Sequence, residues 1–331
     1  MSKNMNILVT GYAGFIGFHL SKSILENTRH NVIGVDNFNN YYPSLIKRGR
    51  SKILKKLKKN KNFIEYKLDI KSNKLNKIFQ NHKIDIVVHL AAQAGIRYTL
   101  KNPKSYIDSN IYGFFNILEN IRRHKIKRLL FASTSSVYGS NEKFPFKETD
   151  KVDNPLQLYS VTKITNELMA NIYSSINSFK AIGLRFFTVY GEYGRPDMAI
   201  HNFVESIDNN KFIKVYGNGN LKRDFTYIDD IVKSIVEIIQ LNKWSLQNKK
   251  NKNYDIFNIG GSNPVSIKKL INIIEKYLGK KAKIIYTKKI SIDMDITYAS
   301  NKKLKSFISK SNFTDLDIGI KKYIQWYRSK I

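Results

Sequence analysis

Tyr159 and Lys163 are the two residues whose types and spacing best fit acid–base chemistry. They stand four positions apart, so a helix through them would place both side chains on one face. A phenol has a pKa of about 10 and is a poor base at neutral pH. A lysine ammonium beside the phenol lowers this pKa and yields a usable phenolate. The pair therefore predicts proton transfer with a substrate hydroxyl group, although surface pairs without function share the same spacing.

Three consecutive hydroxyl residues, Thr134, Ser135 and Ser136, follow an expected strand at residues 128–133. Ligands of α/β proteins bind at the carboxyl edge of the sheet, so these side chains would stand where a ligand binds. This placement strengthens the catalytic interpretation of the pair above. A Ser- and Thr-rich turn that binds nothing is the alternative.

A glycine-rich turn joins an expected strand at residues 7–10 to an expected helix at residues 15–26. Gly11, Gly14 and Gly17 have the spacing of a dinucleotide-binding turn. One glycine allows the tight turn, one lets the backbone approach a pyrophosphate, and one allows close packing of helix and strand. The helix N-terminus would stabilise the anion.

Asp36 ends the next expected strand, residues 31–36, and would accept hydrogen bonds from an adenosine ribose while repelling a 2′-phosphate. Asn37 follows, with no arginine beside it. The sequence therefore predicts NAD rather than NADP as the cofactor. An oxidised nicotinamide near Tyr159 would lower the phenol pKa further.

Short apolar strands alternate with helical patterns over the first 190 residues, which predicts an α/β fold with a Rossmann-type, doubly wound parallel sheet. The expected strands are residues 7–10, 31–36, 63–69, 84–90, 128–133 and 180–186. The rhythm then changes, with expected helices at residues 200–209, 228–241 and 267–278. We expect an NAD-binding domain at 1–190 and a smaller mixed α/β substrate-binding region at 191–331, with a soft and interleaved boundary.

Composition excludes several classes of protein. Hydrophobic residues make up 42% of the 331 residues, enough for a large core. Cysteine is absent, so disulfides and thiolate metal sites are excluded. No apolar run approaches the roughly 18 residues of a membrane-spanning helix, and the six histidines show no ligand spacing. We expect a cytoplasmic protein without a metal site or a membrane partner.

The formal net charge is +31. Such a charge is compatible with nucleic-acid binding, but lysine is used everywhere in the chain and no nucleic-acid-binding motif is present. The densest basic stretch, residues 47–61, keeps apolar residues at helical spacing and predicts an amphipathic helix with a solvated basic face. We expect no nucleic-acid partner.

Together these segments resemble the extended short-chain dehydrogenases, the family of nucleotide-sugar epimerases and dehydratases. The resemblance runs from residue 5 to residue 328 and is carried by residues 11–17, 90–95, 133–139, 159–163 and 184–191. It implies that NAD takes a hydride from C4 of a UDP-sugar and returns it. By this match Tyr159 is the base, Lys163 steadies the phenolate and binds the nicotinamide ribose, and Thr134 binds the reacting oxygen.

The resemblance also implies ligand-binding residues. The cofactor contacts would be Gly11, Gly14, Phe15, Ile16, Gly17, Asp36, Asn37, Asp69, Ile70, Leu90, Ala92, Gln93, Tyr159 and Lys163. Arg223 would lie near the diphosphate of the substrate and Asp293 near the uridine ribose. The family further implies a homodimer formed through residues 103–123 and 159–178.

Residues 36–42, 94–98, 194–199 and 223–230 resemble the family members that convert UDP-glucuronate to UDP-galacturonate at C4. Family dehydratases carry Asp-Glu, and decarboxylases a Glu, where this chain has Ser135 and Ser136. Serine hydroxyls can donate to a substrate carboxylate, whereas a glutamate would repel it. Thr188 and Arg195 are candidates for further donors. Decarboxylation of UDP-glucuronate, epimerisation of a neutral UDP-sugar, and a basic nucleic-acid-binding or regulatory Rossmann protein without chemistry are the alternatives.

Two residues have no settled place in this scheme. Tyr12 stands in the glycine turn where the family commonly has a small residue, and we expect its side chain to point outward. Asn110 is either a residue of an active-site helix or a helix cap.

Overall fold

The computed structural model describes residues 4–57, 62–288, 293–308 and 312–329. The chain divides into two compact units that alternate along the sequence. Unit 1 comprises Met1–Val137, Gln157–Arg185 and Ile235–Phe257, and unit 2 comprises Tyr138–Leu156, Phe186–Ser234 and Asn258–Ile331.

A seven-stranded sheet forms the centre of unit 1. Its strands are β1 (Asn6–Thr10), β2 (Asn31–Asp36), β3 (Phe63–Lys67), β4 (Ile86–His89), β5 (Arg128–Thr134), β6 (Lys180–Phe186) and β10 (Tyr254–Ile259). Their order across the sheet is β10-β6-β5-β4-β1-β2-β3. β1 pairs in parallel with both β2 and β4, β2 with β3, and β4 with β5. The predicted doubly wound α/β fold is confirmed.

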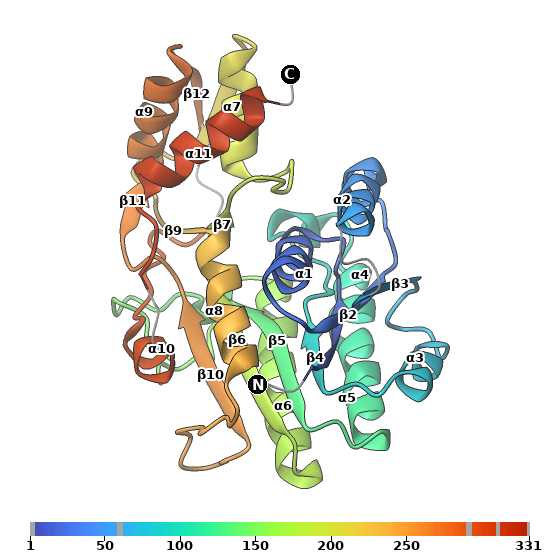
Figure 1. Cartoon of the computed structure of the whole chain (residues 1–331). Coiled ribbons are helices and arrows are strands. Elements are labelled where there is room, and N and C mark those ends of the chain that lie inside the picture. The colour runs from blue at the N-terminus through green and yellow to red at the C-terminus, as the bar shows by residue number, and fades with distance from the viewer. Residues whose placement is uncertain (1–3, 58–61, 289–292, 309–311, 330–331) are drawn as a thin grey trace. The chain divides into compact units, whose positions relative to one another are not determined.

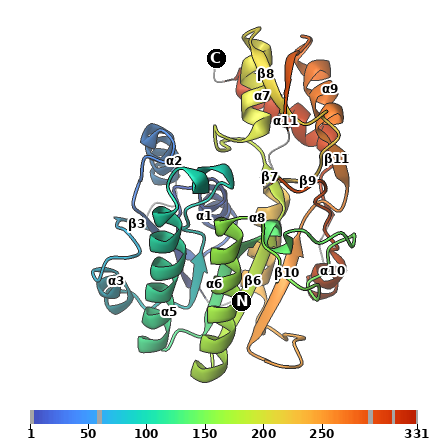
Figure 2. The same ribbon diagram turned by 180° about the vertical axis from the view of Figure 1, so that it is seen from behind.

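Helices cover both faces of this sheet, which explains why its inner strands are buried along almost their whole length. The helices are α1 (Phe15–Asn27), α2 (Ser44–Lys56), α3 (Leu75–Asn81), α4 (Lys104–Tyr106), α5 (Gly113–Arg123) and α6 (Leu158–Asn177). α1 lies in front of the sheet in Figure 1, and α5 and α6 lie in front of the opposite face in Figure 2. The core between α5, α6 and the sheet contains Phe114, Leu129 and Ala170.

The strand β10 was not among the expected strands. It lies beyond residue 190, in the part of the chain that the sequence pattern assigns to the other domain, yet it pairs beside β6 at the edge of the central sheet. The other six strands of this sheet were all expected, and their bounds agree with the expected ranges to within a few residues at each end.

Unit 2 holds two small sheets and several helices. Its strands are β7 (Thr188–Tyr190), β8 (Phe212–Tyr216), β9 (Lys222–Tyr227), β11 (Pro264–Ser266) and β12 (Lys283–Thr287), in the orders β11-β9-β7 and β12-β8. Its helices are α7 (Ala199–Asp208), α9 (Ile267–Leu278), α10 (Lys302–Phe307) and α11 (Leu316–Arg328). α8 (Ile228–Gln240) begins in unit 2 and ends in unit 1.

The basic helix expected at residues 47–61 is α2, which ends at Lys56, and residues 58–61 lie outside the described part of the chain. The expectation that its cations are solvated is wrong for two of them. Lys47 is 6% exposed and Arg50 is 1% exposed. Helical spacing identified the apolar positions of this segment but gave no sign that two cations are buried beside them.

In the described ranges, the longest and most apolar helices still fall short of what a membrane span requires.

Candidate active site

The strand order of the central sheet reverses at β1, because β2 and β3 lie on one side of it and β4 lies on the other. After β1 the chain moves outward through β2 and β3, and it then returns to β4 on the other side of β1. Open α/β sheets bind their ligands at such a reversal, which here lies at the carboxyl ends of β1 and β4. The turn after β1 and the segment after β4 both lie at this edge, because the two strands are parallel neighbours.

Gly11 allows these two segments to touch. Its φ is +74°, and a Cβ atom there would lie 2.7 Å from the backbone nitrogen of Ala91, just after β4. Gly17 is equally constrained, because its Cβ would lie 2.1 Å from the carbonyl oxygen of Gly11. Any side chain at either position would push the turn away from the sheet.

The N-terminus of α1 is available to an anion. In the described parts of the chain no side chain caps this end, where Gly14 is the N-cap residue. The first-turn N–H groups, including those of Phe15, Ile16 and Gly17, lack intrahelical acceptors and carry the positive end of the helix dipole. This arrangement fits the pyrophosphate of a dinucleotide.

Tyr12 does not point outward, so the expectation for this residue is wrong. Its side chain is fully buried and lies over Gly34 of β2, where a Cβ atom would be 2.7 Å from the ring. The hydroxyl donates to the carboxylate of Glu65, at 2.5 Å. Burial and this carboxylate raise the pKa of Tyr12 well above its usual range, so that it stays a neutral donor. The absent side chain at position 34 makes room for the large side chain at position 12.

Asp36 and Asn37 lie where a Rossmann fold binds the adenosine ribose, at the end of β2. Asp36 is buried, and its Oδ1 accepts a hydrogen bond from the backbone of Phe38, at 2.8 Å. Asn37 donates to the Oδ2 atom of Asp69, at 3.0 Å, which joins the segments after β2 and β3. Ile70, the next residue, is buried.

The segment after β4 holds Leu90, Ala92 and Gln93 at the same edge of the sheet. Asn110 fixes this segment, since its side chain accepts from the Gln93 backbone N–H at 2.8 Å and donates to the Gln93 carbonyl at 3.0 Å. Asn110 also donates to Thr162 of α6, at 3.0 Å. Asn110 is not a helix cap, because it lies inside the π-helical segment Ile107–Tyr112. Its role in an active site stays a prediction.

Lys163 is fully buried beneath the carboxyl end of β5. Its ammonium donates to the carbonyl oxygen of Ala132, at 2.9 Å, two residues before Thr134. Burial lowers the pKa of Lys163 to about 8, and the nearby carboxylate of Glu167 opposes this shift. The lysine therefore keeps its charge at neutral pH and can stabilise a phenolate on the same helix.

Thr134 ends β5, and Ser135 and Ser136 form the 3-10 turn that follows. The Thr134 hydroxyl donates to the Ser136 hydroxyl oxygen, at 3.2 Å, and accepts from the Ser136 backbone N–H, also at 3.2 Å. All three side chains are buried at the carboxyl edge of the sheet. A substrate oxygen there would meet hydroxyl groups in place of carboxylates.

Tyr159 lies in the first turn of α6, and its side chain is half-buried. Its ring centroid is 6.1 Å from that of Tyr106, in an edge-to-face arrangement. Tyr106 is itself fully buried and donates to the carbonyl oxygens of Ala94 and Gly95. Tyr106 could not be identified from the sequence, because no spacing connects it to Tyr159.

Glu167 is a second residue of this region that is absent from the sequence-based predictions. Its carboxylate accepts hydrogen bonds from the Ser133 hydroxyl at 2.5 Å and from Arg185 of β6, at 2.9 Å and 2.7 Å. It thereby joins α6 to β5 and β6, immediately beside Thr134. The four-residue spacing from Lys163 to Glu167 was visible in the sequence and could have identified it.

His89 is buried at the end of β4 and bonds to Thr10, at 2.8 Å. Burial and the charge of Lys163 lower the pKa of His89 to about 3, so the imidazole is neutral. Within the described ranges, three or more potential metal ligands never gather at one place.

The remaining sequence-predicted residues belong to unit 2. Thr188 begins β7 and pairs with Phe225 of β9. The guanidinium of Arg195 makes two hydrogen bonds to Asp197, at 3.0 Å and 2.5 Å. Arg223 donates to the Lys222 carbonyl at 2.9 Å, and Asp293 is half-buried.

Comparison with known proteins places this arrangement among enzymes of one family. A UDP-glucuronate 4-epimerase of Thermodesulfobacterium geofontis is 40% identical over 98% of this chain and 96% of that protein. The crystal structure of a UDP-glucuronic acid 4-epimerase from Bacillus cereus, in complex with UDP-glucuronic acid and NAD, has a TM-score of 0.89 and 33% identity, covering 99% of this chain and 100% of that one. A UDP-glucose 4-epimerase from Thermotoga maritima, crystallised with UDP-glucose, has a TM-score of 0.84 and 26% identity, covering 98% of this chain and 99% of that one.

Residues 7–260 match the NAD dependent epimerase/dehydratase family. This match includes the glycine turn, Asp36, the hydroxyl residues after β5 and the Tyr159–Lys163 pair. The chain belongs to the NAD dependent epimerase/dehydratase family.

Proposed function

We propose that this protein is an isomerase that inverts C4 of UDP-glucuronate to give UDP-galacturonate, with NAD bound throughout. The observation that carries this proposal is the position of Lys163, whose buried ammonium is anchored to β5 two residues before Thr134 and one helical turn after Tyr159. A base, its charged neighbour and a hydroxyl donor thus all belong to unit 1.

Three side chains have separate roles in the proposed proton transfer. Tyr159, as the phenolate, takes the proton of the 4-hydroxyl group and later returns it to the same oxygen. Lys163 stabilises the negative charge on Tyr159, and Thr134 donates a hydrogen bond to the reacting oxygen. Bound NAD supplies the redox chemistry, since it accepts a hydride from C4 and returns it to the opposite face, so no cofactor is consumed.

Unit 1 supplies the residues that would hold NAD. The uncapped N-terminus of α1 would bind the pyrophosphate, and the carboxylate of Asp36 would bind the adenosine ribose. The full proposed set is Gly11, Gly14, Phe15, Ile16, Gly17, Asp36, Asn37, Asp69, Ile70, Leu90, Ala92, Gln93, Tyr159 and Lys163. The UDP-sugar would be bound by residues that include Thr188, Arg195, Arg223 and Asp293 of unit 2.

Preference for a uronate is supported by the hydroxyl groups of Ser135 and Ser136. A carboxylate substrate is favoured by donors and disfavoured by a fixed glutamate, which this chain lacks at both positions. The identity to the two structures crystallised with UDP-sugars agrees, at 33% for the UDP-glucuronic acid enzyme and 26% for the UDP-glucose enzyme. We further propose a cytoplasmic location. We also propose that approximately residues 1–190 bind NAD and residues 191–331 bind the UDP-sugar.

Purified protein incubated with UDP-glucuronate, with no added cofactor, is expected to form UDP-galacturonate. The product should have unchanged mass and an inverted C4 centre, read by mass spectrometry and by the proton couplings of the sugar ring. Turnover without added NAD follows because the hydride is returned in every cycle.

Three results would contradict this proposal. Loss of carbon dioxide would identify a decarboxylase and show that Ser135 and Ser136 do not select epimerisation. Absence of product even with added NAD, together with turnover of UDP-glucose, would identify an epimerase of neutral sugars. Tight RNA binding with a steep salt dependence and no turnover would favour the nucleic-acid-binding alternative.

We also propose a homodimer formed through α5 and α6. The outer face of α6 carries exposed apolar residues that a soluble helix seldom presents together, with Leu168 61%, Ile172 57% and Ile176 73% exposed. Phe115 of α5 is also exposed. A second copy of the same two helices would bury this surface in a symmetric contact.

The double substitution Leu168→Glu/Ile172→Glu is expected to convert the protein to a monomer, because it places charges in an apolar contact. Light scattering coupled to size-exclusion chromatography measures the mass directly. Leu45→Glu is the matched control, since Leu45 is 76% exposed on α2, outside the proposed contact. A monomeric wild-type protein, or a dimer that survives the double substitution, would refute the proposed interface.

A further inference from the structure

A buried lysine lies beside the carboxylate that would bind the adenosine ribose. The ammonium of Lys47, from α2, is 3.3 Å from the Oδ1 atom of Asp36 and 2.9 Å from the Oδ1 atom of Asn39. Both side chains of the ion pair are buried, at 8% and 5% exposure. Lys47 also lies 5.5 Å from the ring centroid of Tyr42. The lysine is therefore fixed in place and is not a mobile surface cation.

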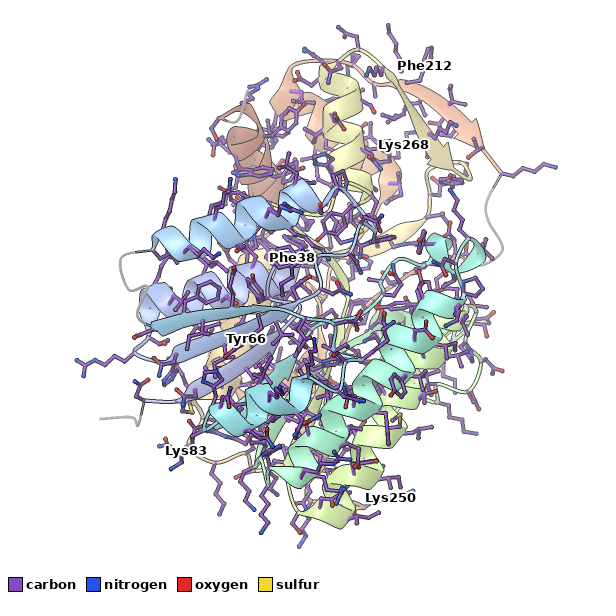
Figure 3. The ribbon with its side chains drawn as sticks, turned by 90° about the vertical axis from the view of Figure 1, so that its right-hand side faces the viewer. Phe38, Tyr66, Lys83, Phe212, Lys250 and Lys268 are labelled. Carbon is purple, nitrogen blue, oxygen red and sulfur yellow. The ribbon has the colours of Figure 1, made fainter. Side chains whose placement is uncertain are left out.

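The loop between β2 and α2 holds this pair together. Phe38 has a φ of +52°, which turns its backbone N–H toward the Oδ1 atom of Asp36. Figure 3 shows Phe38 in this loop, below the ribbon of α2. Oδ1 thus receives two donors, whereas Oδ2 accepts no hydrogen bond from any residue in the described part of the chain. Oδ2 is the atom left for ribose hydroxyl groups.

The ion pair changes how the site discriminates between cofactors. An isolated carboxylate repels a 2′-phosphate with its full charge, and this is the basis on which Asp36 alone predicts NAD. A carboxylate paired with a lysine at 3.3 Å repels it less, because the positive charge offsets part of the repulsion. The cation also offers three donors to any anion that approaches.

We propose that Lys47 is a second determinant of cofactor specificity, which moderates the exclusion of a 2′-phosphate by Asp36 and becomes a phosphate ligand when that carboxylate is neutralised. This inference rests on the proposed NAD site. It assigns a role to a buried cation of α2, a helix whose sequence pattern predicts only a solvated basic face.

Equilibrium binding of NAD and NADP to the apoprotein tests the proposal without any turnover measurement. Asp36→Asn keeps the acceptor for Phe38 and removes the charge, and it is expected to lower the ratio Kd(NADP)/Kd(NAD) by at least about tenfold. Lys47→Met is expected to raise this ratio by about tenfold, because the carboxylate then acts alone. In the double variant Asp36→Asn/Lys47→Met, the gain in NADP affinity should be lost.

Two controls separate recognition from loss of fold. Lys52→Met removes an exposed cation from the same helix and should leave the ratio unchanged. Lys47→Arg keeps the charge and should restore NADP binding in the Asp36→Asn background.

The outcomes distinguish this inference from the proposed function. Equal NADP gains with Lys47 or Met at position 47 would overturn the role of the lysine, as would an unchanged ratio in Lys47→Met, provided that NAD still binds. Failure of the wild-type apoprotein to bind NAD would instead overturn the cofactor assignment itself.

Discussion

Tyr159→Phe is expected to lower the kcat for UDP-glucuronate epimerisation by about 10²–10⁴-fold while NAD remains bound. The substitution removes one oxygen atom from a half-buried ring and leaves the packing against Tyr106 in place. Without this oxygen, the group proposed to accept the 4-hydroxyl proton is missing. Lys163 cannot replace it, because its ammonium must stay charged to act. Initial rates with UDP-glucuronate, together with the stoichiometry of bound NAD, give the two readouts.

The wild-type rate should also fall as the pH rises through about 8. Burial holds the pKa of Lys163 near this value, so a higher pH removes the charge that stabilises the phenolate.

Tyr173→Phe is the matched control for Tyr159→Phe, since Tyr173 lies on the same helix and its hydroxyl donates to Glu119, outside the proposed site. This variant should retain nearly full activity. Full activity in Tyr159→Phe would refute the phenolate mechanism.

Arg185→Leu is expected to lower the free energy of unfolding by about 3–5 kcal/mol. Arg185 and Glu167 form a buried ion pair with two short hydrogen bonds, and the pair joins β6 to α6. Removal of the guanidinium leaves the carboxylate of Glu167 buried, with the Ser133 hydroxyl as its remaining hydrogen-bond donor among the described residues. An unpaired buried charge is far more costly than the loss of a neutral contact. Urea denaturation measures the change.

The double variant Glu167→Leu/Arg185→Leu should recover part of this loss, because it removes both charges of the pair and fills the same volume with apolar groups. The recovery is incomplete, because Lys163 then loses the carboxylate beside it. Arg122→Leu provides the control, since Arg122 pairs with Glu119 on the solvent-exposed surface of α5 and its removal should matter much less. If Arg185→Leu were no more destabilising than Arg122→Leu, the buried pair would not be a stability determinant.

Local sequence patterns predicted the centre of the fold because its strands are short, apolar and rich in β-branched residues. β2 and β6 agree with the expected ranges at both ends. The glycine turn was recognisable for the same reason, since the strand, turn and helix are contiguous in sequence. β10 was missed because its partner β6 lies about seventy residues earlier, across a segment that belongs to unit 2.

The errors at individual residues share one physical cause. Lys47 and Arg50 were predicted to be solvated because a helix considered alone offers no buried partner for a lysine or an arginine. In the structure their hydrogen-bond partners, Asp36 and the Ala13 carbonyl, come from other segments of the chain. Tyr12 was assigned to the surface because its cavity is created by the missing side chain of Gly34, which is 22 positions away. Each of these contacts depends on residues that only the folded chain brings together.

The alternation of the two units constrains how the protein can be made. The chain passes from one unit to the other five times, and the last segment of unit 1, Ile235–Phe257, follows most of the first half of unit 2. During synthesis on the ribosome, β6 must therefore wait as an unpaired sheet edge until β10 emerges from the exit tunnel. An unpaired edge strand is a template for aggregation. A gene fragment that stops near residue 190 would carry the whole dinucleotide turn and yet encode an unfinished sheet.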